Sequence, residues 1–211
     1  MAVRRLLAVV VGAASVGMAV AFAPAADAET TRRYAIPGAG ATIAIPTSWR
    51  ALERRTVTNS ATFRRFVAEN PAMRSLATQM SAPNSPITFM AFDPRPGTFV
   101  TSVNVVLSGS SSGLTPRQAA ASYAREINAQ LPYVVGPVST SVVRLPAGAA
   151  VRAAYRVRFT SAGRSVTTQT LQYLVLRDDT SFVVTLTTLP AEAARRKATF
   201  TAMARSLRFG A

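Results

Sequence analysis

The side chains that most often perform chemistry in proteins are missing from this chain. Its 211 residues include no His and no Cys. Nucleophilic catalysis of the Ser–His or Cys–His kind needs those side chains, so both kinds are excluded. Zinc and copper sites built on imidazole or thiolate are excluded for the same reason.

Carboxylates and one Lys remain as candidates for catalysis. Lys197 follows Arg196 on the polar side of an expected helix, which is typical of a solvated charge run. Asp178 and Asp179 are adjacent in a tight turn, where neighbouring side chains diverge, so we interpret them as turn formers. Four further acids are scattered, with no spacing that groups them: Glu53, Glu69, Asp93 and Glu126. We therefore expect no catalytic residue, no cofactor and no metal site, with a hydrolase built from distant carboxylates as the alternative.

An arginine pattern in the second half of the chain is the one feature that indicates a particular face of the protein for binding. Arg152, Arg156 and Arg158 alternate with apolar residues, so they should share one face of a strand. Three like charges on one face repel unless solvent or anions screen them. The pattern indicates either a solvated strand face that resists aggregation or a strip that binds an anionic partner.

The overall charge points the same way. The chain carries 24 Lys and Arg against nine Asp and Glu, and Lys197 is its only Lys. A surface this positive favours partners rich in carboxylate or phosphate, which the guanidinium group binds well. A general bias of composition toward Ala and Arg explains the same numbers.

The first 28 residues have the pattern of a secretory signal peptide. Two Arg precede an apolar run from residue 6 to residue 23, and Ala26-Asp27-Ala28 is a small-x-small cleavage site. We expect cleavage between Ala28 and Glu29, which leaves a secreted or extracytoplasmic protein of the periplasm or cell wall. Retention of the apolar run as an anchor stays open, as does the choice between general and twin-arginine export. Export argues against nucleic acid as a partner and for an anionic envelope component or a protein.

The remaining chain is expected to form a flexible lead-in over residues 29–40 and a single α+β domain over residues 41–211. Its first half predicts a short strand at residues 42–46, two helical pieces over residues 59–80 and strands at residues 87–92 and 102–107. After a Ser/Gly loop at residues 108–113, Thr115-Pro116-Arg117-Gln118 is a capping box that predicts a helix to about Leu131.

From residue 138 the apolar pattern changes to a period of two. It predicts strands at residues 138–145, 151–159, 166–176 and 182–189, joined by short turns as an antiparallel meander. A last helix should begin at Pro190 and bury Phe200, Met203, Ala204 and Leu207. The result is a central antiparallel sheet flanked by helices.

Three segments of the chain resemble PsbP-like domains. They are Thr42–Trp49, Leu145–Val151 and the run from Phe182 through Phe200 to Phe209. The resemblance covers most of residues 41–209 and implies the α/β/α sandwich of the PsbP and Mog-type family, which binds proteins or small ligands, generally without catalysis. Within that family the chain is most similar to actinobacterial envelope proteins of the LpqN type, although it has no Cys to carry a lipid.

These observations favour a non-enzymatic binding or accessory protein outside the cytoplasm. It would dock a protein or an anionic ligand through a basic surface at Arg152, Arg156 and Arg158. The alternative is a carboxylate-dependent hydrolase of cell-envelope polymers, which two acids within about 10 Å in an open cleft would favour. Plain adhesion to an anionic polymer is a third possibility.

Overall fold

The computed structural model of the chain describes residues 29–53, 85–95, 99–108, 114–161, 164–177 and 180–210. The expected signal peptide and its cleavage site at Ala28, the helical pieces over residues 59–80, the Ser/Gly loop after Ser108 and the acids Asp178 and Asp179 lie outside these residues. In the part that the structure describes, no helix combines the length and the apolar character needed to cross a bilayer.

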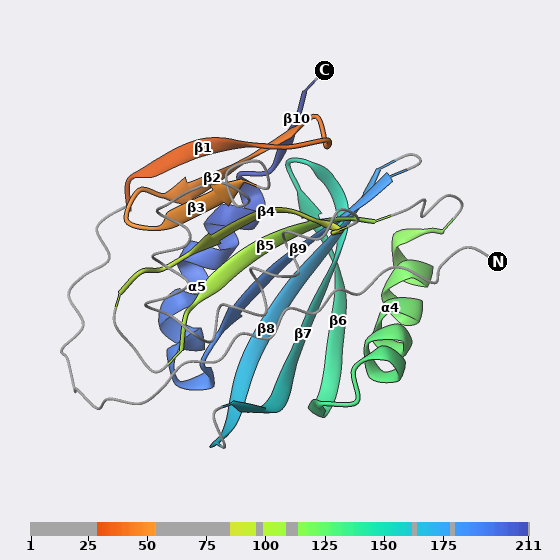
Figure 1. Cartoon of the computed structure of the whole chain (residues 1–211). Helices are drawn as coiled ribbons and strands as arrows, with labels where there is room; N and C mark the ends of the chain where they lie inside the picture. The colour runs from red at the N-terminus through yellow and green to blue at the C-terminus, as the bar shows by residue number, and fades with distance from the viewer. Residues whose placement is uncertain are drawn as a thin grey trace.

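A seven-stranded antiparallel sheet forms the centre of the protein (Figure 1). Its order is β3-β4-β5-β9-β8-β7-β6, and the meander predicted for the second half of the chain is confirmed. Strands β7 and β8 are longer than expected, because their pairing continues to Ser161 and Arg164. The bounds are β3 Arg50–Glu53, β4 Ile87–Phe92, β5 Ser102–Ser108, β6 Val134–Leu145, β7 Gly148–Ser161, β8 Arg164–Arg177 and β9 Thr180–Thr188.

A second sheet of three strands corrects the prediction of one central sheet. It has the order β1-β2-β10, with β1 at Thr31–Ile36, β2 at Ala41–Pro46 and β10 at Arg208–Phe209. The expectation of a flexible lead-in over residues 29–40 is therefore wrong. The first three residues of β1 are exposed and polar, so the segment has a loop-like composition, yet Ile36 is buried and its pairing with β2 orders the strand.

Both helices expected in the second half of the chain are confirmed. Helix α4, Pro116–Gln130, begins with the predicted capping box, in which the Thr115 hydroxyl accepts from the Gln118 backbone N–H at 3.3 Å. Helix α5, Pro190–Arg205, begins with Pro at its first turn. The predicted inner stripe of Phe200, Met203, Ala204 and Leu207 is buried.

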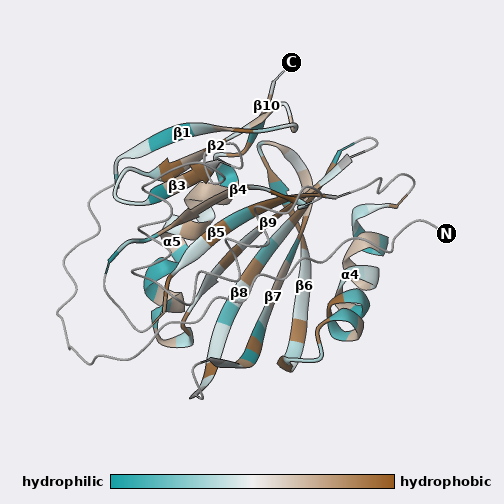
Figure 2. Ribbon diagram, in the orientation of Figure 1, coloured by the Kyte–Doolittle hydropathy of each residue, from teal (hydrophilic) through white to brown (hydrophobic). Residues whose placement is uncertain are grey.

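The two helices cover opposite faces of the seven-stranded sheet. Helix α4 packs on β6 and β7, over a core that contains Tyr155 and Ile127. Helix α5 packs on β8 and β9 from the other side, together with the small sheet, over a core that contains Phe200 and Leu186. Figure 2 shows hydrophobic positions along the central strands and hydrophilic ones on β1 and α4. Because α5 stops at β8, no described helix covers β6 and β7 on its side of the sheet.

Candidate functional site

The arginine face is the surface formed by Arg152, Arg156 and Arg158 on β7. The alternate residues of this strand, such as Val151 and Tyr155, are buried against α4. Successive side chains of a strand point to opposite sides, so the three Arg lie on the other face, the one that α5 leaves open. All three are exposed, as the alternation predicted. Their role in binding stays a prediction.

Neutral side chains of β8 lie opposite these arginines and orient them. Arg156 is paired with Gln169, and its Nε donates to the Gln169 Oε1 at 3.4 Å. Arg158 is paired with Thr167, and its Nε donates to the Thr167 Oγ1 at 3.4 Å. No hydrogen bond within the described residues uses the terminal nitrogens of either guanidinium. The neighbours therefore support the stems and leave the forked ends to solvent or to a partner.

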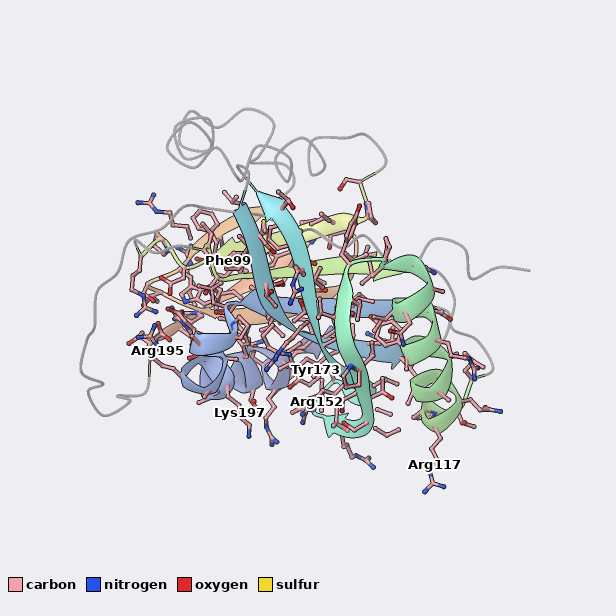
Figure 3. The ribbon with its side chains drawn as sticks, turned by 90° about the horizontal axis from the view of Figure 1, so that it is seen from below. Phe99, Arg117, Arg152, Tyr173, Arg195 and Lys197 are labelled. Carbon is pink, nitrogen blue, oxygen red and sulfur yellow. The ribbon has the colours of Figure 1, made fainter. Side chains whose placement is uncertain are left out.

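No carboxylate of the chain segment around the arginine face offsets its charge. The sequence from residue 127 to residue 177 contains six Arg and no Asp or Glu. Tyr173, opposite Arg152, connects this surface to α5: burial raises the pKa of Tyr173, while the charge of Arg152 and a hydrogen bond with Thr201 oppose that change. Figure 3 shows Arg152, Tyr173 and Lys197 toward the same lower edge of the view. The positive charge of the arginine face is therefore not balanced by carboxylates of β6, β7 or β8.

A second charged site lies where β4 ends and α5 begins. We call it the arginine–carboxylate niche, and it surrounds a hollow of about 190 Å³. Asp93 follows β4 directly, and its backbone N–H donates to the carbonyl of Thr101, the residue before β5. The lining residues are Asp93, Arg95, Phe99, Thr101, Glu192, Arg195 and Arg196.

The charged groups of the niche form a continuous chain of ion pairs. The buried Asp93 carboxylate accepts from Arg95 Nη2 at 2.6 Å and from Arg196 Nη2 at 2.5 Å. Arg196, itself only 8% exposed at its side chain, also contacts Glu192 at 3.4 Å. Glu192 in turn accepts from Arg195 at 2.9 Å. Charges thus alternate from Arg95 to Arg195, and three cations surround two anions.

These contacts keep Asp93 ionised. Burial by itself would raise its pKa, but the hydrogen bonds from the Arg95 side chain and backbone, together with the charge of Arg196, hold the pKa below its usual value. The same hydrogen bond raises the pKa of Arg95. Asp93 therefore anchors the two cations instead of exchanging protons near neutral pH.

The niche does not have the pattern of a glycosidase-type pair of acids. Asp93 and Glu192 do line one hollow, but Arg196 lies against both. Acid–base hydrolysis by two carboxylates needs one of them protonated through a raised pKa, and the pKa of Asp93 moves in the opposite direction. No group of three metal-ligating side chains occurs among the described residues. The arrangement instead keeps both carboxylates paired with arginines.

Sequence reasoning misses this niche. The local pattern indicates solvated charges beside Lys197 and an isolated Asp93, whereas Arg196 is buried on Asp93 although the two residues lie far apart in the chain. One local signal is available, the spacing of four between Glu192 and Arg196 on a helix. Lys197 itself is exposed, as expected.

Comparisons with known proteins identify the fold. No protein-family model matches the chain, and no curated protein matches its sequence. The solution structure of the cyanobacterial PsbP (CyanoP) from Synechocystis sp. PCC 6803 is similar, with a TM-score of 0.51 and 10% identity over 90% of this chain and 99% of that one. The crystal structure of the Ran-binding protein Mog1p from Saccharomyces cerevisiae gives a TM-score of 0.52 and 12% identity over 86% of this chain and 96% of that one.

A third structure, LpqN of Mycobacterium tuberculosis, aligns with a TM-score of 0.46 and 14% identity over 87% of this chain and 86% of that one. At the identities of CyanoP and Mog1p the likeness defines the fold and no residue roles. The chain therefore has the PsbP/Mog-like α+β fold, which confirms the resemblance stated from its sequence.

Proposed function

We propose that this protein is a non-enzymatic binding or accessory protein that docks an anionic partner through the arginine face. The observation that carries the proposal is a row of three exposed guanidinium groups on a sheet face that no described helix covers. Residues i and i+2 of a strand lie about 7 Å apart, so Arg156 and Arg158 present two forked donors side by side. Such donors recognise carboxylate and phosphate groups.

The proposal includes a location outside the cytoplasm. The N-terminal pattern of Arg4 and Arg5, an apolar run and Ala26–Ala28 supports export, and the partner would then be an anionic envelope component or a protein. Mog1p is a Ran-binding protein, so holding a protein partner is one use of this fold. Fold likeness alone is a weak argument for function, so the charge pattern carries more weight.

The absence of turnover is part of the proposal. The chain has no His or Cys, and Asp93 and Glu192 are both held by arginines. Hydrolysis of a cell-envelope polymer by the purified protein, lost in Glu192→Gln while the circular dichroism spectrum stays unchanged, would establish the carboxylate-dependent hydrolase instead.

The test replaces Arg152, Arg156 and Arg158 together with Gln. The control replaces three exposed Arg of the helices, Arg117, Arg125 and Arg205, with Gln, so that both variants lose the same net charge. We expect the first variant to bind immobilised polyglutamate at least tenfold more weakly than the wild type and the control to lose less than threefold. Binding by the wild type should also weaken as salt rises.

Two results would contradict the proposal. Equal losses in the two variants would show attraction to net charge without a docking face. Unchanged binding in the arginine-face variant would place the contact elsewhere. A pull-down from a native cell envelope at two ionic strengths, with the same two variants, then separates specific capture from plain adhesion.

A further inference from the structure

The arginine–carboxylate niche has the size of a site for a small molecule. Its hollow of about 190 Å³ is smaller than the pockets that hold drug-sized ligands, which begin at about 300 Å³. Figure 3 shows Phe99 and Arg195 on the same side of the molecule as the start of α5.

The floor of the niche is rigid and already paired. Asp93 is 3% exposed at its side chain, and both of its carboxylate oxygens accept from Arg95, while Arg196 adds a further contact. Arg196 is held on its other side by Glu192. Because both Asp93 oxygens already accept hydrogen bonds from arginines, Asp93 does not draw a cation into the hollow.

The mouth of the niche offers donors. The side chains of Arg95 and Arg195 are 58% and 59% exposed. Arg95 uses Nε and Nη2 on Asp93, and no hydrogen bond among the described residues uses its Nη1. Arg195 uses Nη2 on Glu192. The charge of a third carboxylate, Glu29, also acts on Arg95, so the positive charges here are largely balanced. Donors of Arg95 and Arg195 nevertheless remain free at the mouth, and such donors suit a carboxylate.

One wall of the hollow is aromatic. Phe99 lines it and is only 8% exposed, so a small part of its ring is the apolar contact beside the cations. We propose that the niche binds a small organic acid, with its carboxylate at Arg95 and Arg195 and its apolar body against Phe99. This ligand site is separate from the arginine face, which lies on β7, and the two proposals can fail independently.

The experiment is a titration of the purified protein with benzoate, followed by calorimetry and by the NMR signals of the Arg side chains. We expect saturable binding of one benzoate, at least fivefold tighter than acetate, which lacks an apolar body. Arg195→Gln should weaken benzoate binding at least tenfold, and Arg195→Lys, which keeps the charge and loses the fork, should weaken it by a similar factor.

Two controls separate the niche from the rest of the surface. Arg205→Gln removes one exposed charge from the same helix, and the arginine-face variant removes three from β7; both should bind benzoate within twofold of the wild type. The proposal is wrong if benzoate binding does not saturate, if Arg205→Gln weakens it as much as Arg195→Gln, or if acetate or inorganic phosphate binds as tightly as benzoate.

Discussion

At the scale of single residues, burial decides what a charge or a hydroxyl can do. Asp93 and Tyr155 are both almost fully buried, but Asp93 is surrounded by cations and the Tyr155 hydroxyl has no hydrogen-bond partner among the described residues. The hydroxyl of Tyr123, a residue of α4 that packs in the same core as Tyr155, donates to the Gln172 Oε1 at 2.8 Å. These differences in bonding partners predict different effects of mutation on stability at positions that are equally buried.

The first prediction concerns the stability of Asp93→Asn. Removing this carboxylate leaves the buried Arg196 with only its longer contact to Glu192, so we expect a loss of about 3 kcal/mol in the free energy of unfolding. Glu192→Gln, at a half-exposed position, should cost less than about 1 kcal/mol. Urea unfolding at neutral pH measures both, and equal losses would contradict the assignment of Asp93 as the anchor.

The pH dependence follows from the lowered pKa of Asp93. Its pKa in the folded protein lies below the usual value of 3.8, so its contribution to stability is complete above about pH 4 and is lost as the pH falls further. We expect the stability of the wild type to drop between about pH 4 and pH 2 more steeply than that of Asp93→Asn. Urea unfolding of both proteins over this pH range tests the expectation. If the free energies of unfolding of the two proteins fall in parallel, Asp93 does not stabilise the fold through its ion pairs.

A comparison of two tyrosines gives a further prediction. Tyr155→Phe removes a buried hydroxyl that lacks a partner among the described residues, so it should leave the protein equally stable or more stable by about 1 kcal/mol. Tyr123→Phe breaks the bond to Gln172 and should destabilise by about 1–2 kcal/mol. Thermal unfolding of both variants gives the comparison, and a larger loss for Tyr155→Phe would reverse the interpretation.

At the scale of elements, the spacing of apolar residues and the residues that begin helices determine which strands and helices can be predicted from the sequence. The long strands β7 and β8 and both helices follow from alternation, the Thr115 capping box and the Pro190 start. Strand β1 does not, because its outer residues are polar and only its pairing with β2 orders it. The niche is also hidden, since it joins the end of β4 to the first turns of α5, and no local pattern encodes a contact of that range.

A prediction at this scale concerns Phe200 on α5. Its ring is buried between the helix and the sheet, so Phe200→Ala should lower the free energy of unfolding by about 3–5 kcal/mol. Thr199→Ala, one residue earlier and half-exposed, is the control and should cost less than about 1 kcal/mol. An unchanged melting temperature for Phe200→Ala would contradict the packing of α5.

At the scale of the whole molecule, the charge is unevenly distributed. The net charge is +15, and the segment that forms β6, β7 and β8 carries no acid. Repulsion among these cations opposes the compact state and is screened by salt, so the melting temperature should rise from low to moderate ionic strength. The arginine-face variant should be more stable than the wild type at low salt, and this advantage should disappear at high salt. Calorimetry at two salt concentrations checks both expectations.

The last strand of the small sheet has a consequence for how the protein matures. Strand β10 pairs with the start of β2, and the Ser206 hydroxyl accepts from the Ala44 backbone N–H at 2.8 Å, so residues that follow α5 hold the hairpin of β1 and β2. Contacts this remote in sequence close late, because most of the chain must be in place beforehand. During synthesis one edge of β2 therefore stays unpaired until the residues after α5 have been made, and removing residues 206–210 would leave that edge without its partner strand.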